Sequence, residues 1–191
     1  MSRKTLKPTD LKLYNFILEK DLKNRYRYGI ISSEWNPEIT DRLVNGVFDF
    51  FSEINIDKDK VNYLKVPGSY ELINGCAQMQ EHYEFSAIIA VGSIIKGETK
   101  HFDFISQSIC NGIAHLNATG PCPIILCLLT DDNYAQALDR SGGKYGNKGY
   151  DCARAAVYMS SSREYMYESY EKVHALFSDS PKSKEGGRSN Q

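Results

Sequence analysis

The segment 92–101, GSIIKGETKH, combines residue types that could bind an anion and move a proton. Gly92 and Gly97 have the spacing of a nucleotide-binding phosphate loop, but Glu98 replaces the lysine that such a loop requires. Thr99 is suited to cap a helix that begins just after it, and free amides at a helix start bind small anions. The pattern therefore argues against a nucleoside triphosphate and leaves two alternatives, a smaller anion or an ordinary strand-to-helix turn.

His101 falls in the first turn of the predicted helix, where the helix dipole favours the neutral imidazole. A neutral histidine beside an anion site could act as a general base. Arg140 precedes a glycine-rich loop and could close on the same anion through its planar guanidinium. Taken alone, His101 or Arg140 could be a solvated surface residue. The hypothesis of an anion site with a general base therefore rests on the two residues together.

Two other segments could bind the remainder of a substrate. Trp35, the only tryptophan, stands beside Asn36 and could stack on a flat heterocycle, although a core position is the alternative. Glu71 follows a Pro-Gly pair and could accept hydrogen bonds from hydroxyl groups, or it could cap the next helix. These residues would supply an aromatic surface and a carboxylate next to the anion site.

The elements that would position these residues follow an α/β pattern. Short apolar segments of β type alternate with longer helical ones, and they span 28–32, 61–66, 86–91 and 123–130. Near-continuous Val, Ile and Leu runs are typical of parallel strands covered on both faces. We predict a doubly wound α/β sheet, in which ligands bind beyond the carboxyl ends of the strands, where all the candidate residues fall.

The composition describes an ordinary globular chain. Of its 191 residues 41% are hydrophobic and 25% charged, and the net charge of -1 gives no reason to expect nucleic acid or an anionic membrane as partner. No apolar run approaches the roughly 20 residues of a membrane-spanning helix. The N-terminus lacks the apolar region of a signal peptide, so we expect a cytoplasmic protein.

The chain divides into one domain and two tails. We predict an N-terminal arm at 1–26, a domain at 27–177 whose helical pattern runs on past Met159, and a polar, disordered tail at 178–191. The arm either docks on protein or is a solvated tail. The five cysteines form no Cys-x-x-Cys pair, so we expect small buried thiols and neither a disulfide framework nor a metal site.

Four longer motifs occur in the chain: SEWNPEIT at 33–40, VPGSYEL at 66–72, GSIIKGETKHFDFIS at 92–106 and LLTDDNYAQALDRSGGKYGNKG at 128–149. In order and spacing they resemble those of the lumazine synthases of riboflavin biosynthesis, and the resemblance covers 28–159. It implies a flavodoxin-like three-layer α/β/α sandwich with a mainly four-stranded parallel sheet, assembled as pentamers and in some members as icosahedral shells. It also implies condensation of 5-amino-6-(D-ribitylamino)uracil with 3,4-dihydroxy-2-butanone 4-phosphate to 6,7-dimethyl-8-ribityllumazine, phosphate and water, without cofactor or metal.

The resemblance also implies roles for particular residues. His101 matches the residue that transfers protons. The phosphate site would comprise Glu98, Thr99 and Arg140. The pyrimidine and ribityl groups would be bound by Trp35, Asn36, Ser69, Tyr70, Glu71, Ser93, Ile94, Ile95, Leu126 and Lys148, of which Leu126 stands where phenylalanine is often found.

The same resemblance implies a homo-oligomer, because the site of these enzymes lies between subunits and the Arg140 region comes from the neighbouring chain. Riboflavin synthase is a candidate partner. Two alternative functions remain open at this point. An archaeal-type riboflavin synthase would not need a phosphate site, and a non-catalytic flavin- or lumazine-binding shell protein would not need His101 and Arg140.

Overall fold

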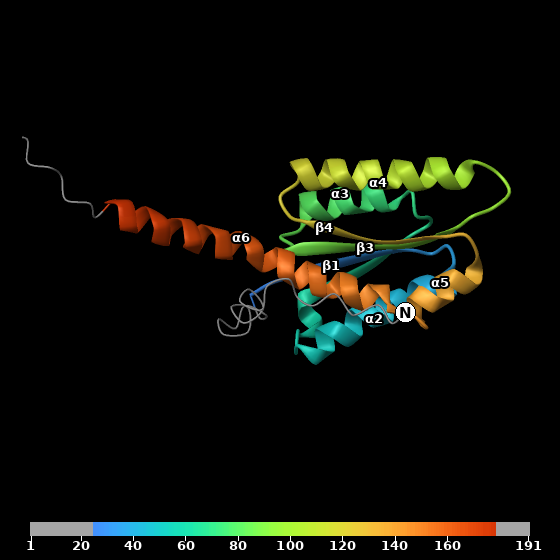
Figure 1. Cartoon of the computed structure of the whole chain (residues 1–191), viewed down its shortest axis with the longest axis horizontal. Helices are drawn as coiled ribbons and strands as arrows, with labels where there is room; N and C mark the ends of the chain where they lie inside the picture. The colour runs from blue at the N-terminus through green and yellow to red at the C-terminus, as the bar shows by residue number, and fades with distance from the viewer. Residues whose placement is uncertain (1–24, 179–191) are drawn as a thin grey trace, which may run out of the picture.

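The computed structural model describes residues 25–178, which form a parallel four-stranded sheet of order β2-β1-β3-β4 between two layers of helices (Figure 1). The predicted α/β sandwich is confirmed. The strands are β1 (Tyr28–Ser33), β2 (Val61–Val66), β3 (Ala87–Ile95) and β4 (Ile124–Asp131). The helices are α2 (Pro37–Glu53), the short 3-10 turn η2 (Lys58–Lys60), α3 (Leu72–His82), α4 (His101–Thr119), α5 (Tyr134–Arg140) and α6 (Lys148–Ser178).

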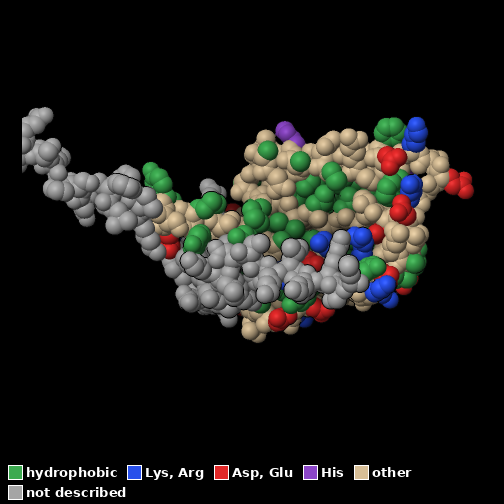
Figure 2. Space-filling model, viewed as in Figure 1, with side chains coloured by type: hydrophobic (Ala, Val, Ile, Leu, Met, Phe, Trp, Pro, Cys, Tyr) green, Lys and Arg blue, Asp and Glu red, His purple; other side chains and the backbone are tan. Residues whose placement is uncertain are grey.

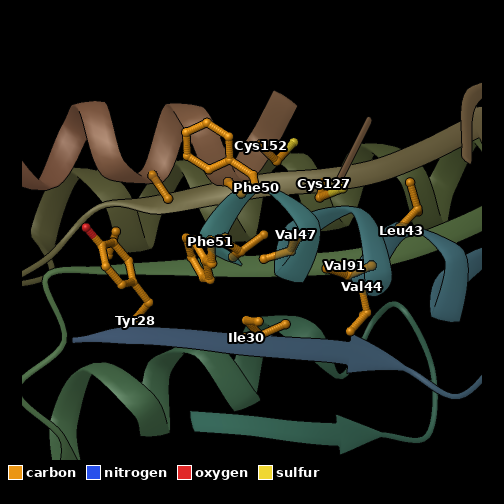
Figure 3. Packing of buried hydrophobic residues seen from close by; sticks show 14 of the residues in the cluster. Tyr28, Ile30, Leu43, Val44, Val47, Phe50, Phe51, Val91, Cys127 and Cys152 are labelled. Carbon is orange, nitrogen blue, oxygen red and sulfur yellow. The ribbon is translucent and has the colours of Figure 1, made fainter. Parts of the chain in front are cut away.

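The sheet is covered on both faces, which explains its apolar strands. Helices α3 and α4 lie on one face, and α2, α5 and α6 lie on the other (Figure 1). The inner strand β3 is buried from Ala87 to Ser93, whereas the edge strand β2 is largely exposed. On the α2 and α6 side the core is built around Tyr28, Ile30, Val47 and Phe51 (Figure 3). Burial of these side chains fixes the strands whose ends carry the candidate site.

A glycine sets the close approach of α6 to α2. A Cβ added to Gly149 would lie 1.9 Å from the carbonyl oxygen of Leu43, which is backbone and cannot rotate away. We expect Gly149→Ala to lower the free energy of unfolding by about 1–3 kcal/mol, because the two helices must move apart. Urea denaturation would measure the change. Gly97→Ala is the control, since a Cβ there meets no atom within 4 Å, and an equal loss of stability in both variants would contradict the argument.

A short hairpin between α5 and α6 was not predicted. Strands β5 (Ser141–Gly143) and β6 (Gly146–Asn147) pair antiparallel, and Gly142 and Gly146 adopt φ angles of 122° and 80°. These angles are open to glycine and strained for other residues. The hairpin is too short and too glycine-rich to show an alternating pattern in the sequence, which is why only a loop was expected.

The ends of the chain lie mostly beyond this description. Apart from residues 25, 26 and 178, the predicted arm and tail fall outside the described residues, so both stay predictions. Helix α6 continues past the sheet (Figure 1), and its side chains Met166, Tyr167 and Tyr170 are exposed there. None of the helices within residues 25–178 is long and apolar enough to cross a membrane.

The five cysteines are all free thiols. Four of them are buried, as predicted, in contact with the apolar core: Cys76, Cys122, Cys127 and Cys152. The expectation is wrong for Cys110, which is exposed. It lies on the outer surface of α4, one position past the buried Ile109. Successive helix residues point in different directions, so an apolar run in the sequence does not bury each of its members.

Candidate active site

All four strands point the same way, so their carboxyl ends meet at one edge of the sheet (Figure 1). Charged side chains of both signs gather at this end of the molecule (Figure 2). The candidate residues come from the segments that leave the strands at this edge.

The junction of β1 with α2 is fixed by Asn36. Its backbone adopts φ 56° and ψ 56°, a left-handed conformation that asparagine tolerates, and Pro37 then starts the helix. The Asn36 amide Nδ2 donates to the carbonyl oxygen of Ser93 at 3.0 Å. Trp35 next to it is 72% exposed, so the alternative of a core tryptophan is wrong. An indole face is therefore free to stack, directly beside the end of β3.

The segment after β2 lies against the same strand end. The buried Ser69 hydroxyl donates to the Ser33 hydroxyl at 3.3 Å, and a Cβ added to Gly92 would lie 2.8 Å from Ser69 Oγ. Tyr70 is 51% exposed. Glu71 occupies the N-cap position of α3, but its side chain makes no capping hydrogen bond. Its carboxylate is thus free to accept hydrogen bonds from a ligand.

The end of β3 presents mainly its backbone. Ser93, Ile94 and Ile95 pair with Leu129, Thr130 and Asp131 of β4. Ile94 and Ile95 are partly buried. The hydroxyl oxygen of Ser93 is buried and has no hydrogen-bond partner within residues 25–178. A buried polar atom without a partner at a strand end points to a functional position.

The turn at 97–101 departs from the prediction in one respect. Thr99 does not cap α4, because the helix begins at His101 with Lys100 in the N-cap position. The Thr99 hydroxyl instead accepts a hydrogen bond from the His101 backbone amide at 3.3 Å, as short hydroxyl side chains do in turns. Glu98, Thr99 and His101 are all exposed, so the turn is open to a ligand.

At the end of β4, Arg140 forms an ion pair with Asp131, a residue that was not among the predicted site residues. Arg140 Nε lies 3.3 Å from Oδ1 of Asp131, whose side chain is only 2% exposed. Burial raises the pKa of Asp131, while the Arg140 guanidinium lowers it and Asp132 raises it. The signal that could have identified Asp131 is an aspartate at the end of an otherwise apolar strand.

Two predicted site residues lie apart from this group. Leu126 is in the middle of β4, paired with Ala90, well before the carboxyl end of the strand. Lys148 starts α6 and its Nζ lies 3.9 Å from Asp151 Oδ2. Among the hydrogen bonds and ion pairs of residues 25–178, none joins Arg140 to the turn at 97–101. One chain thus brings the Trp35, Ser69 and Ser93 segments together at the end of the strand that leads to His101, whereas Leu126 and Lys148 lie apart and Arg140 is held at Asp131.

The arrangement can hold a flat ring, hydroxyl groups and a small anion, with an imidazole available for proton transfer. Within residues 25–178 no three His, Cys, Asp or Glu side chains are grouped so that they could hold a metal ion.

Comparison with known proteins identifies one family. Residues 25–164 match the family described as 6,7-dimethyl-8-ribityllumazine synthase. The chain is similar to the 6,7-dimethyl-8-ribityllumazine synthase of Christiangramia forsetii, with 49% identity over 140 residues that make up 73% of this chain and 83% of the relative. It is similar to the enzyme of the same name from Bacteroides fragilis, with 43% identity over 133 residues, 70% of this chain and 93% of the relative.

Proposed function

The chain belongs to the 6,7-dimethyl-8-ribityllumazine synthase family, and from this we propose that it condenses 5-amino-6-(D-ribitylamino)uracil with 3,4-dihydroxy-2-butanone 4-phosphate in riboflavin biosynthesis. The observation that carries the proposal is the Asn36–Ser93 hydrogen bond. It joins the exposed Trp35 to the strand that leads into the turn bearing His101, so that a ring-binding surface and an anion-binding turn share one edge.

The residue types match the parts of the two substrates. Trp35 stacks on the pyrimidine beside Asn36, while Ser93, Ile94 and Ile95 read the pyrimidine edge through their backbone. Ser69, Tyr70 and Glu71 bind the ribityl chain, with the uncapped Glu71 carboxylate accepting from its hydroxyls. Thr99 and the backbone amide of Glu98 bind the phosphate, assisted by Arg140.

Every step of this reaction moves a proton. The substrate amine attacks the ketone and forms an imine with loss of water, phosphate leaves by elimination, and the ring closes with loss of a further water. A histidine beside the phosphate site can accept and return these protons. Arg140 stabilises the departing phosphate, and fixing the two substrates side by side removes much of the entropic barrier.

We propose that the complete site forms between subunits of a homo-oligomer, a pentamer or an assembly of pentamers. Leu126 and Lys148 lie away from the His101 segment within one chain, and no hydrogen bond or ion pair within residues 25–178 joins Arg140 to the turn at 97–101, which supports this. Exposed apolar side chains, among them the 65% exposed Phe104 on α4, support burial against another subunit. Sedimentation velocity of the purified protein would give the size of the assembly. Riboflavin synthase remains a candidate partner.

A shared site makes a prediction about mixed oligomers. Co-expressing His101→Ala chains with Arg140→Ala chains is expected to restore activity to about a quarter of the wild-type level, because random assortment pairs an intact His101 with an intact neighbouring Arg140 in that fraction of sites. Differently tagged chains purified over both tags would be assayed for lumazine formation. Each variant expressed alone is the control. No restoration in the mixed oligomer would place both residues in the same chain's site.

One assay tests the function itself. The purified protein is mixed with the uracil amine and the butanone phosphate, and lumazine absorbance and phosphate release are followed together. The proposal expects both signals in equal amounts. Product from lumazine alone would indicate a riboflavin synthase, and tight riboflavin binding without any product would indicate a binding protein.

A further inference from the structure

Two buried side-chain oxygens lack a hydrogen-bond partner within residues 25–178, and both lie at the carboxyl edge of the sheet. One is the Ser93 hydroxyl, and the other is Oδ2 of Asp131. We propose that Asp131 is a positioning residue for the reaction, which holds Arg140 by its Nε so that both terminal guanidinium nitrogens face the substrate phosphate. The proposal rests on the function proposed above.

The ion pair uses only one edge of the arginine. Arg140 Nε lies 3.3 Å from Asp131 Oδ1, and the Arg140 side chain is 50% exposed while that of Asp131 is almost fully buried. A guanidinium has five donors in a rigid fork, and contact at Nε leaves the end-on edge, with one N–H from each Nη group, available to another ligand. Within residues 25–178 the Arg140 guanidinium has no ion-pair or hydrogen-bond partner other than Asp131. The end-on edge matches two phosphate oxygens.

Backbone hydrogen bonds hold Asp131 next to the segment that leads into the turn at 97–101. Asp131 pairs with Ile95 at the end of the sheet, and its carbonyl oxygen accepts from the Lys96 amide at 2.9 Å. Lys96 leads directly into the turn at 97–101. Asp131, which holds Arg140, is therefore hydrogen-bonded to the end of β3, and the proposed phosphate-binding turn of the same chain follows directly from this strand end.

An aspartate is an unfavourable choice here unless the arginine needs it. Its neighbours of like orientation, Leu129 and Ile95, belong to the apolar core on that face, and one carboxylate oxygen remains unsatisfied. A buried carboxylate without full hydrogen bonding costs stability, so packing alone would favour an apolar residue. The carboxylate could instead compete with phosphate for Arg140, and the two roles predict opposite changes in affinity.

Asp131→Asn tests the proposal, because asparagine keeps the volume and the Oδ1 acceptor but loses the charge. We expect the KM for the butanone phosphate to rise about fivefold, because weakening the ion pair loosens the position of the guanidinium, with kcat and the KM for the pyrimidine nearly unchanged. Asp131→Ala is expected to raise the same KM further. Inorganic phosphate as a competitive inhibitor should lose affinity in parallel.

Two controls separate positioning from a structural role. Asp132→Asn removes an exposed carboxylate 3.8 Å from Lys96 and should leave the KM for the butanone phosphate unchanged. In an Arg140→Ala background, Asp131→Asn should cause no additional rise, since its effect passes through the arginine. The inference would be overturned by an unchanged or lowered KM for the butanone phosphate in Asp131→Asn, or by an equal rise of this KM when Asp131→Asn is added to Arg140→Ala. Neither outcome would affect the proposed function as long as the wild type forms lumazine. Absence of product from the wild type would instead remove the function itself.

Discussion

Arg140→Ala is expected to raise the KM for 3,4-dihydroxy-2-butanone 4-phosphate by roughly 30- to 100-fold while the KM for the pyrimidine stays nearly constant. A two-pronged, charge-assisted contact to phosphate contributes about 2–3 kcal/mol, and each 1.4 kcal/mol corresponds to about tenfold in affinity. Arg140 lies at the end of α5 with a half-exposed side chain, so its removal leaves no cavity in the core. Steady-state kinetics with each substrate varied in turn would measure the effect.

The chain offers two comparisons for this variant. Arg140→Lys keeps the charge but loses the planar fork, so its KM should fall between those of the wild type and the alanine variant. Lys58→Ala removes an exposed cation in the turn before β2, at the opposite end of the sheet, and should change neither KM. A larger change in the pyrimidine KM than in the phosphate KM would show that Arg140 has another role.

The sequence predicted the sheet because burial on both faces leaves a continuous apolar signal. The strand boundaries were less exact, and β3 continues to Ile95 where the prediction stopped at Val91. The extra residues include Gly92 and Ser93, which read as a loop by composition, yet pairing with β4 keeps them extended. Tertiary pairing, which local composition does not encode, decided this boundary.

The site was predictable to the extent that its residues follow strands directly. Trp35 and His101 fall at strand-to-helix junctions, and the rule that ligands bind at this edge is enough to select them. Asp131 was missed because its importance comes from a contact with Arg140 across the β4–α5 turn, which only the folded chain displays. Thr99 was assigned as a cap from its type alone, whereas the turn directs its hydroxyl to the amide of His101.

His101→Ala is expected to lower kcat by about 10²-fold or more, the usual contribution of a positioned proton-transfer group, and to leave pyrimidine binding nearly intact. His101 opens α4 from an exposed turn, and within residues 25–178 its imidazole has no hydrogen-bond or ion-pair partner. The ring is therefore available to a substrate and its loss disturbs no internal contact. Single-turnover formation of lumazine would report the step, and titration of the pyrimidine would report binding.

His115→Ala is the matched control for this variant. His115 is also exposed and lies on the same helix, about 21 Å along its axis from His101, so it shares the chemistry but not the location. Its replacement should leave kcat unchanged. Added imidazole should partly restore turnover to His101→Ala if the lost group was a proton carrier, because a free imidazole can enter the open turn. Wild-type turnover in His101→Ala would show that His101 does not carry the proton. Water or the substrate would then transfer it, and catalysis would come from Arg140 and the positioning of the two substrates.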